Sequence, residues 1–178
     1  MRVKRIIVGC LFCVAFAFAV WVGLVLYLRH TSGPPKEAKM MMNFNDHRAA
    51  FEKLREMLQA DTQVRRVADW GVETTKGTFS PVAGRFPDDR YAQYLALLKE
   101  AGGGLAYRNE GEHPNPGIIV WATGFGGDTS HVGISWEDQT PTNLVTSLDD
   151  HVQRRKHGER RRVVYRHVDE NWYLWTDW

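Results

Sequence analysis

Cysteine is nearly absent from this 178-residue sequence. The two cysteines, Cys10 and Cys13, both lie in the N-terminal apolar run, so the rest of the chain has none. A disulfide framework is therefore excluded for the region after this run, and so is a metal cluster held by thiolates. For the same reason cysteine gives no information about the redox compartment.

A strong charge of one sign is also missing. Four of the 23 lysines and arginines flank the apolar run, which leaves 19 basic residues against 21 acidic ones in the rest of the chain. A domain this close to neutrality is not typical of a globally basic nucleic-acid-binding protein. We therefore expect no nucleic-acid partner.

Catalytic and metal-binding motifs are scarce. The 7 histidines show no HExxH motif and no pair at metal-ligand spacing, so neither a metal nor another cofactor is expected. Acidic residues and histidines in the loop 108–117 and at 149–151 are interpreted as ordinary polarity, because no nucleophile accompanies them. We predict no catalytic residues, and a binding protein is favoured over an enzyme.

One long apolar run stands out. Residues 6–28, IIVGCLFCVAFAFAVWVGLVLYL, contain no charged side chain. A helix of this length is about 35 Å long, enough to cross a hydrocarbon core of about 30 Å. We predict an uncleaved transmembrane helix, a signal anchor. The alternatives are a cleaved signal peptide ending near Ala17 and a lipoprotein signal ending at Cys10, whose apolar segment before the cysteine is short.

Charges beside this run predict its orientation. Three basic residues in the tip 1–5 precede it, whereas those after it are more widely spaced. The positive-inside rule places the tip in the cytoplasm of a bacterium and the domain, residues 43–178, on the extracytoplasmic side of the inner membrane. Residues 29–42 contain two adjacent prolines and are interpreted as a linker.

Small residues recur every four positions within the run, at Ala15, Ala19 and Gly23. Such a face lets two helices approach closely, because small side chains bring the backbones together. The spacing predicts a homodimer formed through the membrane span.

Two amphipathic helices begin the domain. Apolar residues recur at helical spacing within 43–61 and again within 87–104. After Gly104 short apolar runs alternate with turn-forming residues, and the last pair of runs is joined by Asp169–Asn171 with the asparagine in a left-handed position. The fold predicted is α+β: one N-terminal transmembrane helix, then two amphipathic helices packed on an antiparallel β-meander.

The aromatic C-terminus, YRHVDENWYLWTDW, is predicted to lie mostly in the core. If its two strands alternate regularly, neither face of the hairpin is polar, so we expect it to be covered on both sides or to lie centrally in the sheet. One face carries Val164, Arg166, Val168, Trp172, Leu174 and Trp178, and the other carries Val163, Tyr165, His167, Tyr173 and Trp175. The functional candidate is whichever face the helices leave open.

Two stretches are candidates for a site. The basic run 154–162 suits a phosphate, a lipid headgroup or an acidic protein, although charge runs are often only solvated connections. The glycine-rich loop 124–131 suits a hydrolase, although a flexible hairpin tip is the favoured explanation of its turn residues. The candidate residues are Arg154, Arg155, Lys156, Arg160, Arg161, Arg162, Arg166 and Trp175 for the first, and Asp128, Ser130 and His131 for the second.

The C-terminal third resembles a group of small, uncharacterised bacterial membrane-anchored proteins. The similar features are the glycine-to-aromatic strand Gly133–Trp136, the step Leu148-Asp149, the strand Tyr165–Val168 and the closing strand Trp172–Leu174. The resemblance implies a closing β-hairpin and brings no activity with it.

These features predict a membrane-anchored, non-catalytic binding domain with a protein partner. An immunity-like or envelope-interaction protein is the sharpest form of this hypothesis. Two alternatives remain: a sensor of lipid headgroups or other ligands that uses 154–162, and a membrane-tethered hydrolase that uses 124–131.

Overall fold

The chain forms two compact units, Met1–Pro34 and Pro35–Trp178. The computed structural model describes residues 18, 20–23, 33–77, 79–80, 86–109, 115–123, 129–154 and 162–178. In the first unit these residues include a short helical segment with Phe18 and Trp21 exposed. Across the described residues, no helix is both long and apolar enough to cross a membrane. Most of the predicted span 6–28 lies outside them.

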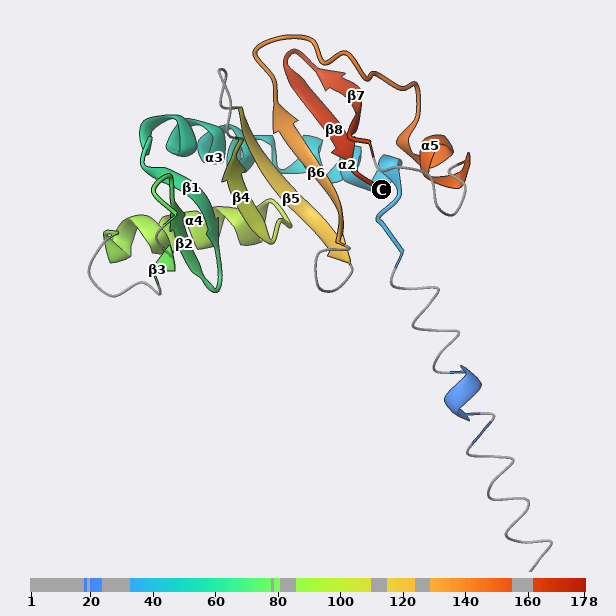
Figure 1. Ribbon diagram of the computed structural model, residues 1–178, viewed down its shortest axis with the longest axis horizontal. Coiled ribbons are helices and arrows are strands. Elements are labelled where there is room, and N and C mark those ends of the chain that lie inside the picture. Colours follow the sequence, from blue (N-terminus) through green and yellow to red (C-terminus); the bar gives the residue numbers. More distant parts are fainter. Residues whose placement is uncertain are drawn as a thin grey trace, which may run out of the picture. The chain divides into compact units, whose positions relative to one another are not determined.

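The second unit is an α+β domain, as predicted (Figure 1). Eight strands form one sheet in the order β3-β2-β1-β4-β5-β6-β8-β7, and each neighbouring pair is antiparallel. The strands are β1 (Val64–Ala68), β2 (Gly71–Thr74), β3 (Phe79–Ser80), β4 (Leu105–Arg108), β5 (Pro116–Thr123), β6 (Ser130–Trp136), β7 (Val164–Asp169) and β8 (Trp172–Thr176). The described helices of this unit are α2 (Glu37–Asp46), α3 (Arg48–Ala60), α4 (Asp88–Glu100) and α5 (Leu148–Arg154).

The strand order corrects the predicted meander. Strands β1 to β3 run outward to one edge, and the chain then returns through α4 so that β4 pairs with the other side of β1. From there β4, β5 and β6 continue in order, and β8 is placed between β6 and β7. The return through α4 follows from its buried residues Tyr91, Tyr94 and Leu98, because a helix with one apolar stripe packs back on the sheet.

The first predicted helix is two helices. His47, with φ −120° and ψ 24°, separates α2 from α3. Residues 37–42, which were assigned to the linker, are the first turns of α2. The prolines were misleading because they stand just before the helix, where proline does not interrupt helical hydrogen bonds. The predicted helix within 87–104 is confirmed as α4.

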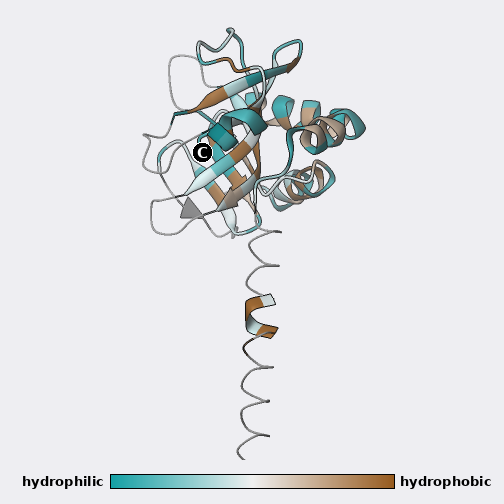
Figure 2. Ribbon diagram, turned by 90° about the vertical axis from the view of Figure 1, so that its right-hand side faces the viewer, coloured by the Kyte–Doolittle hydropathy of each residue, from teal (hydrophilic) through white to brown (hydrophobic). Residues whose placement is uncertain are grey.

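Helices α3 and α4 pack on one face of the sheet, called here the covered face (Figure 2). Trp172 of β8 is fully buried there, with ring centroids 5.4 Å from Phe44 and 5.6 Å from Trp136. Its indole Nε1 donates to Glu52 Oε1 of α3 over 2.8 Å. The burial predicted for the C-terminal aromatics is therefore confirmed for Trp172, and it extends to Tyr173 and Trp175.

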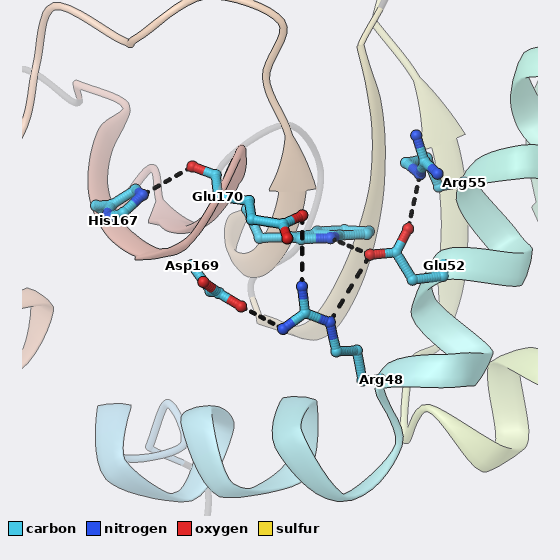
Figure 3. Close-up of polar contacts among 7 residues, drawn as sticks. Arg48, Glu52, Arg55, His167, Asp169 and Glu170 are labelled. Carbon is cyan, nitrogen blue, oxygen red and sulfur yellow. Dashed lines mark hydrogen bonds and ion pairs between the residues drawn. The ribbon is translucent and has the colours of Figure 1, made fainter.

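The turn between β7 and β8 differs from the prediction. The left-handed residue is Glu170 (φ 47°), not Asn171, and a bulge places Asp169 rather than Val168 opposite Trp172. Arg48 of α3 holds this turn by pairing with both Asp169 and Glu170 (Figure 3). The hairpin also lies at the edge of the sheet, not at its centre.

Candidate functional site

The face of the sheet opposite α3 and α4, called here the open face, carries the candidate site. Residues that pair directly across neighbouring strands point to the same side of a sheet. The register pairs Tyr107 with Gly117, Gly133 with Trp175, and Trp175 with Tyr165. Their neighbours along the strands, such as Ala106, Ile118 and Leu174, are fully buried in the core cluster on the covered face.

Two glycines on the open face make room for aromatic rings. A Cβ added at Gly117 would lie 2.5 Å from the hydroxyl end of Tyr107. A Cβ added at Gly133 would lie 2.7 Å from Trp175 Nε1 and 2.6 Å from the Ile118 carbonyl oxygen. Since real Cβ contacts are longer than this, any other residue at these positions would displace the rings.

Tyr107 and Trp175 meet above these glycines. Their ring centroids are 5.9 Å apart in an edge-to-face arrangement, although β5 and β6 separate their strands. Neighbouring strands lie about 4.8 Å apart, so β4 and β8 would be about 14 Å apart in a flat sheet. The contact therefore needs both rings to reach inward over β5 and β6.

A cleft of about 490 Å³ lies beside this aromatic pair, and we call it the Trp175 cleft. Its volume lies within the range of about 300–1,000 Å³ that is usual for small-ligand sites. Apolar, aromatic, polar and charged side chains all contribute to its walls. They are Arg66, Leu105, Tyr107, Asn109, Ile119, Thr129, His131, Val163, Tyr165, Trp175 and Asp177.

His131 is held in this cleft by Asp177. The Nδ1 atom of His131 lies 2.7 Å from Asp177 Oδ2, and the backbone N–H of His131 donates to Asp177 Oδ1. A carboxylate accepts only, so Nδ1 carries the proton and the second ring nitrogen, Nε2, has its lone pair free in the neutral ring. Among the described residues, no protein group bonds to Nε2.

A buried carboxylate adjoins the two tyrosines. Glu137 is 7 % exposed and accepts hydrogen bonds from Ser135 Oγ and Asn115 Nδ2. Burial raises the pKa of Glu137, and the two hydrogen bonds oppose this rise. Loss of hydration, with the nearby charge of Glu137 adding to it, raises the pKa of the Tyr107 and Tyr165 hydroxyls. Both hydroxyls therefore stay protonated and can donate hydrogen bonds.

The indole nitrogen of Trp175 is buried without a well-formed hydrogen bond among the described residues. It lies near the Tyr107 hydroxyl and partly offsets the rise in the pKa of that group. Buried polar atoms usually have a partner. The Trp175 N–H is an exception, because the ring packs against Tyr107 without bringing the N–H into good hydrogen-bond geometry.

The predicted loop site is divided by the sheet. Ser130 and His131 are consecutive residues of β6, so their side chains point to opposite faces. Ser130 is 7 % exposed, whereas His131 reaches the Trp175 cleft. The two residues therefore form no Ser–His pair, and Asp128 lies outside the described residues.

The predicted basic site is also divided. Arg154 and Arg162 are exposed, and Arg155, Lys156, Arg160 and Arg161 lie outside the described residues. Arg166, also predicted for this site, points to the covered face, where it pairs with Glu37 and donates to Met41 Sδ. Trp175 is the member of this predicted set that lines the Trp175 cleft.

Glu37 also joins two helix starts. Its Oε2 accepts from the backbone N–H of Leu148 at the start of α5 over 2.8 Å, while Asp149 Oδ1 accepts from the N–H of Glu37 over 3.2 Å. Free N–H groups at helix starts favour acidic partners, so each helix provides a carboxylate for the other. Arg166 therefore has a structural partner, and its pairing with Leu174 across β8 places it on the covered face, away from the Trp175 cleft.

No cluster of three or more histidine, cysteine, aspartate or glutamate residues suited to a metal ion occurs in the described part of the chain. No protein-family model, curated protein or solved structure matches the chain.

The sequence contained a sign of the Trp175 cleft that the initial interpretation missed. Gly117 and Gly133 both interrupt apolar strand segments, and a glycine inside a strand often marks a close approach of another group. Asp177 was not selected at all, because its partnership with His131 depends on the β6–β8 register.

Proposed function

We propose that this chain is a membrane-anchored binding protein that recognises its ligand through the Trp175 cleft. The observation that supports this most directly is the cleft itself, on a sheet face that the helices leave uncovered. Half-buried tyrosines and an oriented histidine line it, and such convergent polar groups beside aromatic walls are typical of ligand sites.

In this proposal residues 6–28 anchor the chain, with the tip 1–5 in the cytoplasm and the domain outside it. The uncharged run and the basic tip support the anchor and its orientation. Pairing of two copies through Ala15, Ala19 and Gly23 belongs to the same proposal.

Of the two versions expected from the sequence, an envelope-interaction protein is favoured over an immunity-like one. A stable protein–protein interface usually buries about 800 Å² of surface on each partner. The Trp175 cleft instead has a volume typical of a site for a small ligand. The hydrolase alternative is disfavoured because Ser130 and His131 point to opposite faces of β6. The headgroup sensor is disfavoured because Arg166 already pairs with Glu37.

Hydrogen exchange on the full chain tests the proposal without assuming a ligand chemistry. The chain is measured with and without the cell-envelope fraction of the organism that carries it. We expect slower exchange in β4, β6 and β8, and unchanged exchange in α3. Unchanged exchange in these strands, or slowing confined to the helices, would refute binding at the Trp175 cleft. Protease treatment of intact and of permeabilised cells tests which side the domain faces.

A further inference from the structure

We infer that the Trp175 cleft takes a neutral polyhydroxylated ligand, that is, a carbohydrate. This inference rests on the proposed function and names the chemistry of the ligand. Three properties of the cleft lead to it: the pairing of its charges, its mixture of donors and acceptors, and its aromatic walls.

The charges of the cleft are already paired. Arg66 is the one permanent cation among its described lining residues, and Arg66 Nη1 lies 3.4 Å from Glu73 Oε2. Asp177 is paired with His131. An anionic ligand would have to compete with Glu73 for Arg66, so a neutral ligand fits the cleft better than a phosphate or a carboxylate.

The hydrogen-bonding groups are of both kinds. In the tautomer whose Nδ1–H donates to Asp177, Nε2 of His131 accepts; the Tyr165 hydroxyl donates and accepts, and the Asn109 amide does both. Carboxylate oxygens can only accept, so they cannot pair with a lone pair on His131 Nε2, whereas a ligand hydroxyl can donate to it. A ligand hydroxyl donates and accepts at once, and it can satisfy His131 and Tyr165 together.

The walls supply the apolar part of the recognition. Trp175, Tyr107 and Tyr165 place rings beside the polar groups. Sugar rings have C–H faces that pack on aromatic rings while their hydroxyls point sideways, and tyrosine and tryptophan combine an apolar body with a polar tip. The aromatic rings can thus pack on the C–H face of a sugar ring, while the polar groups bond to its hydroxyls.

His131→Asn is the variant that tests this inference. The asparagine Nδ2 takes the position of histidine Nδ1, so the bond to Asp177 is kept while the Nε2 acceptor is removed. The matched control is His167→Asn, because His167 also lies on the open face but outside the cleft, where its Nε2 contacts the Glu170 carbonyl. Comparing the thermal unfolding of both variants with that of the wild type shows that each remains folded.

The probes are a printed array of neutral and acidic oligosaccharides, and inorganic phosphate as the anion. The full chain is used in a detergent without a sugar headgroup. We expect binding to at least one neutral oligosaccharide, weakened about fivefold to tenfold by His131→Asn and unchanged by His167→Asn, as loss of one hydrogen bond predicts.

Three results would overturn the carbohydrate inference: no oligosaccharide binds, only acidic oligosaccharides or phosphate bind, or His131→Asn binds neutral oligosaccharides as the wild type does. The proposed function has a separate readout. If the envelope fraction slows exchange in β4, β6 and β8 while no oligosaccharide binds, binding at the cleft stands and the carbohydrate inference fails. If exchange is unchanged, the proposed function fails as well.

Discussion

On the covered face of the sheet large side chains interlock, whereas on the open face two aromatic rings lie over glycines. Trp172 and Trp175 are three residues apart in one strand and show the contrast. The Trp172 indole is surrounded by Phe44, Phe51 and Trp136, and its N–H has an acceptor. The Trp175 N–H has no well-formed hydrogen bond among the described residues, and its ring borders a cleft.

Through this difference one strand contributes to the core on one side and to the proposed ligand cleft on the other. Side chains alternate between the two faces, so substitutions on one side need not disturb the other. The covered face carries the hydrophobic core, and the open face carries the cleft that we propose as the ligand site. Four substitutions test this division, taken here from the largest expected effect to the smallest.

Trp172→Ala should lower the free energy of unfolding by about 3–5 kcal/mol, as truncation of a buried aromatic residue does. The loss combines the emptied volume with the loss of the indole hydrogen bond to Glu52, whose carboxylate keeps its pair with Arg55. Denaturant unfolding measures the effect. Trp178→Ala is the control, because Trp178 is half-buried and contacts Trp121, and it should cost about 1 kcal/mol. A loss below 1 kcal/mol for Trp172→Ala would show that the covered face does not dominate stability.

Gly133→Ala should lower the free energy of unfolding by about 1–3 kcal/mol, because the new Cβ would clash with the Ile118 carbonyl and with Trp175. Tryptophan fluorescence should change as well, since the Trp175 ring must move. Gly104→Ala is the control: its Cβ meets no atom within 4 Å, and its effect should stay within about 0.5 kcal/mol. Equal behaviour of the two variants would mean that the aromatic rings do not depend on the glycines.

Glu37→Gln should cost about 1–2 kcal/mol, since it leaves Arg166 without a charged partner and weakens the acceptor for Leu148 N–H. Asp150→Asn breaks a pair with Arg154 whose side chains are 81 % and 56 % exposed, and it should cost less than about 0.5 kcal/mol. Both values come from denaturant unfolding. If the two losses are the same, burial adds nothing to the Glu37 pair.

Glu137→Gln should change how the free energy of unfolding depends on pH more than it changes the value of that free energy at one pH. The pKa of Glu137 is raised in the folded protein, so folding favours the protonated form. Its contribution is most favourable below the ordinary glutamate pKa of about 4.3 and is lost as the pH rises through the higher folded value. Urea midpoints measured across this range should fall less steeply for Glu137→Gln than for the wild type. An unchanged slope would contradict the raised pKa.

The parts of the fold that could be predicted are those specified by neighbouring residues. The apolar stripe of α4, with Tyr91, Tyr94 and Leu98, is visible within 13 residues. The division of the last hairpin into two faces was also correct for Trp172 and Trp175, because alternation along a strand is local. Its turn was wrong, since regular alternation does not reveal the bulge before Asp169, a residue that pairs with Arg48 from a distant helix.

The parts that could not be predicted depend on contacts between distant residues. His131 was selected for the chemistry of its loop, but its partner Asp177 is 46 residues away. Arg166 was assigned to a basic patch because it follows the basic run 154–162 closely in the sequence. Its partner Glu37 lies at the start of α2, which was interpreted as part of the linker because two prolines stand just before it.

The contacts of Glu37 have a consequence for the order in which the domain is completed during synthesis. The amide of Leu148 that Glu37 accepts from is 111 residues further along the chain. At about 5–20 residues per second, a ribosome needs roughly 6–20 s to make that stretch. During this interval the start of α2 has been made but its partners have not. The start of α2 is thus stabilised only when the growing chain has supplied α5 and β7, whereas its later part can pack on α3 earlier, through Phe44 and Phe51.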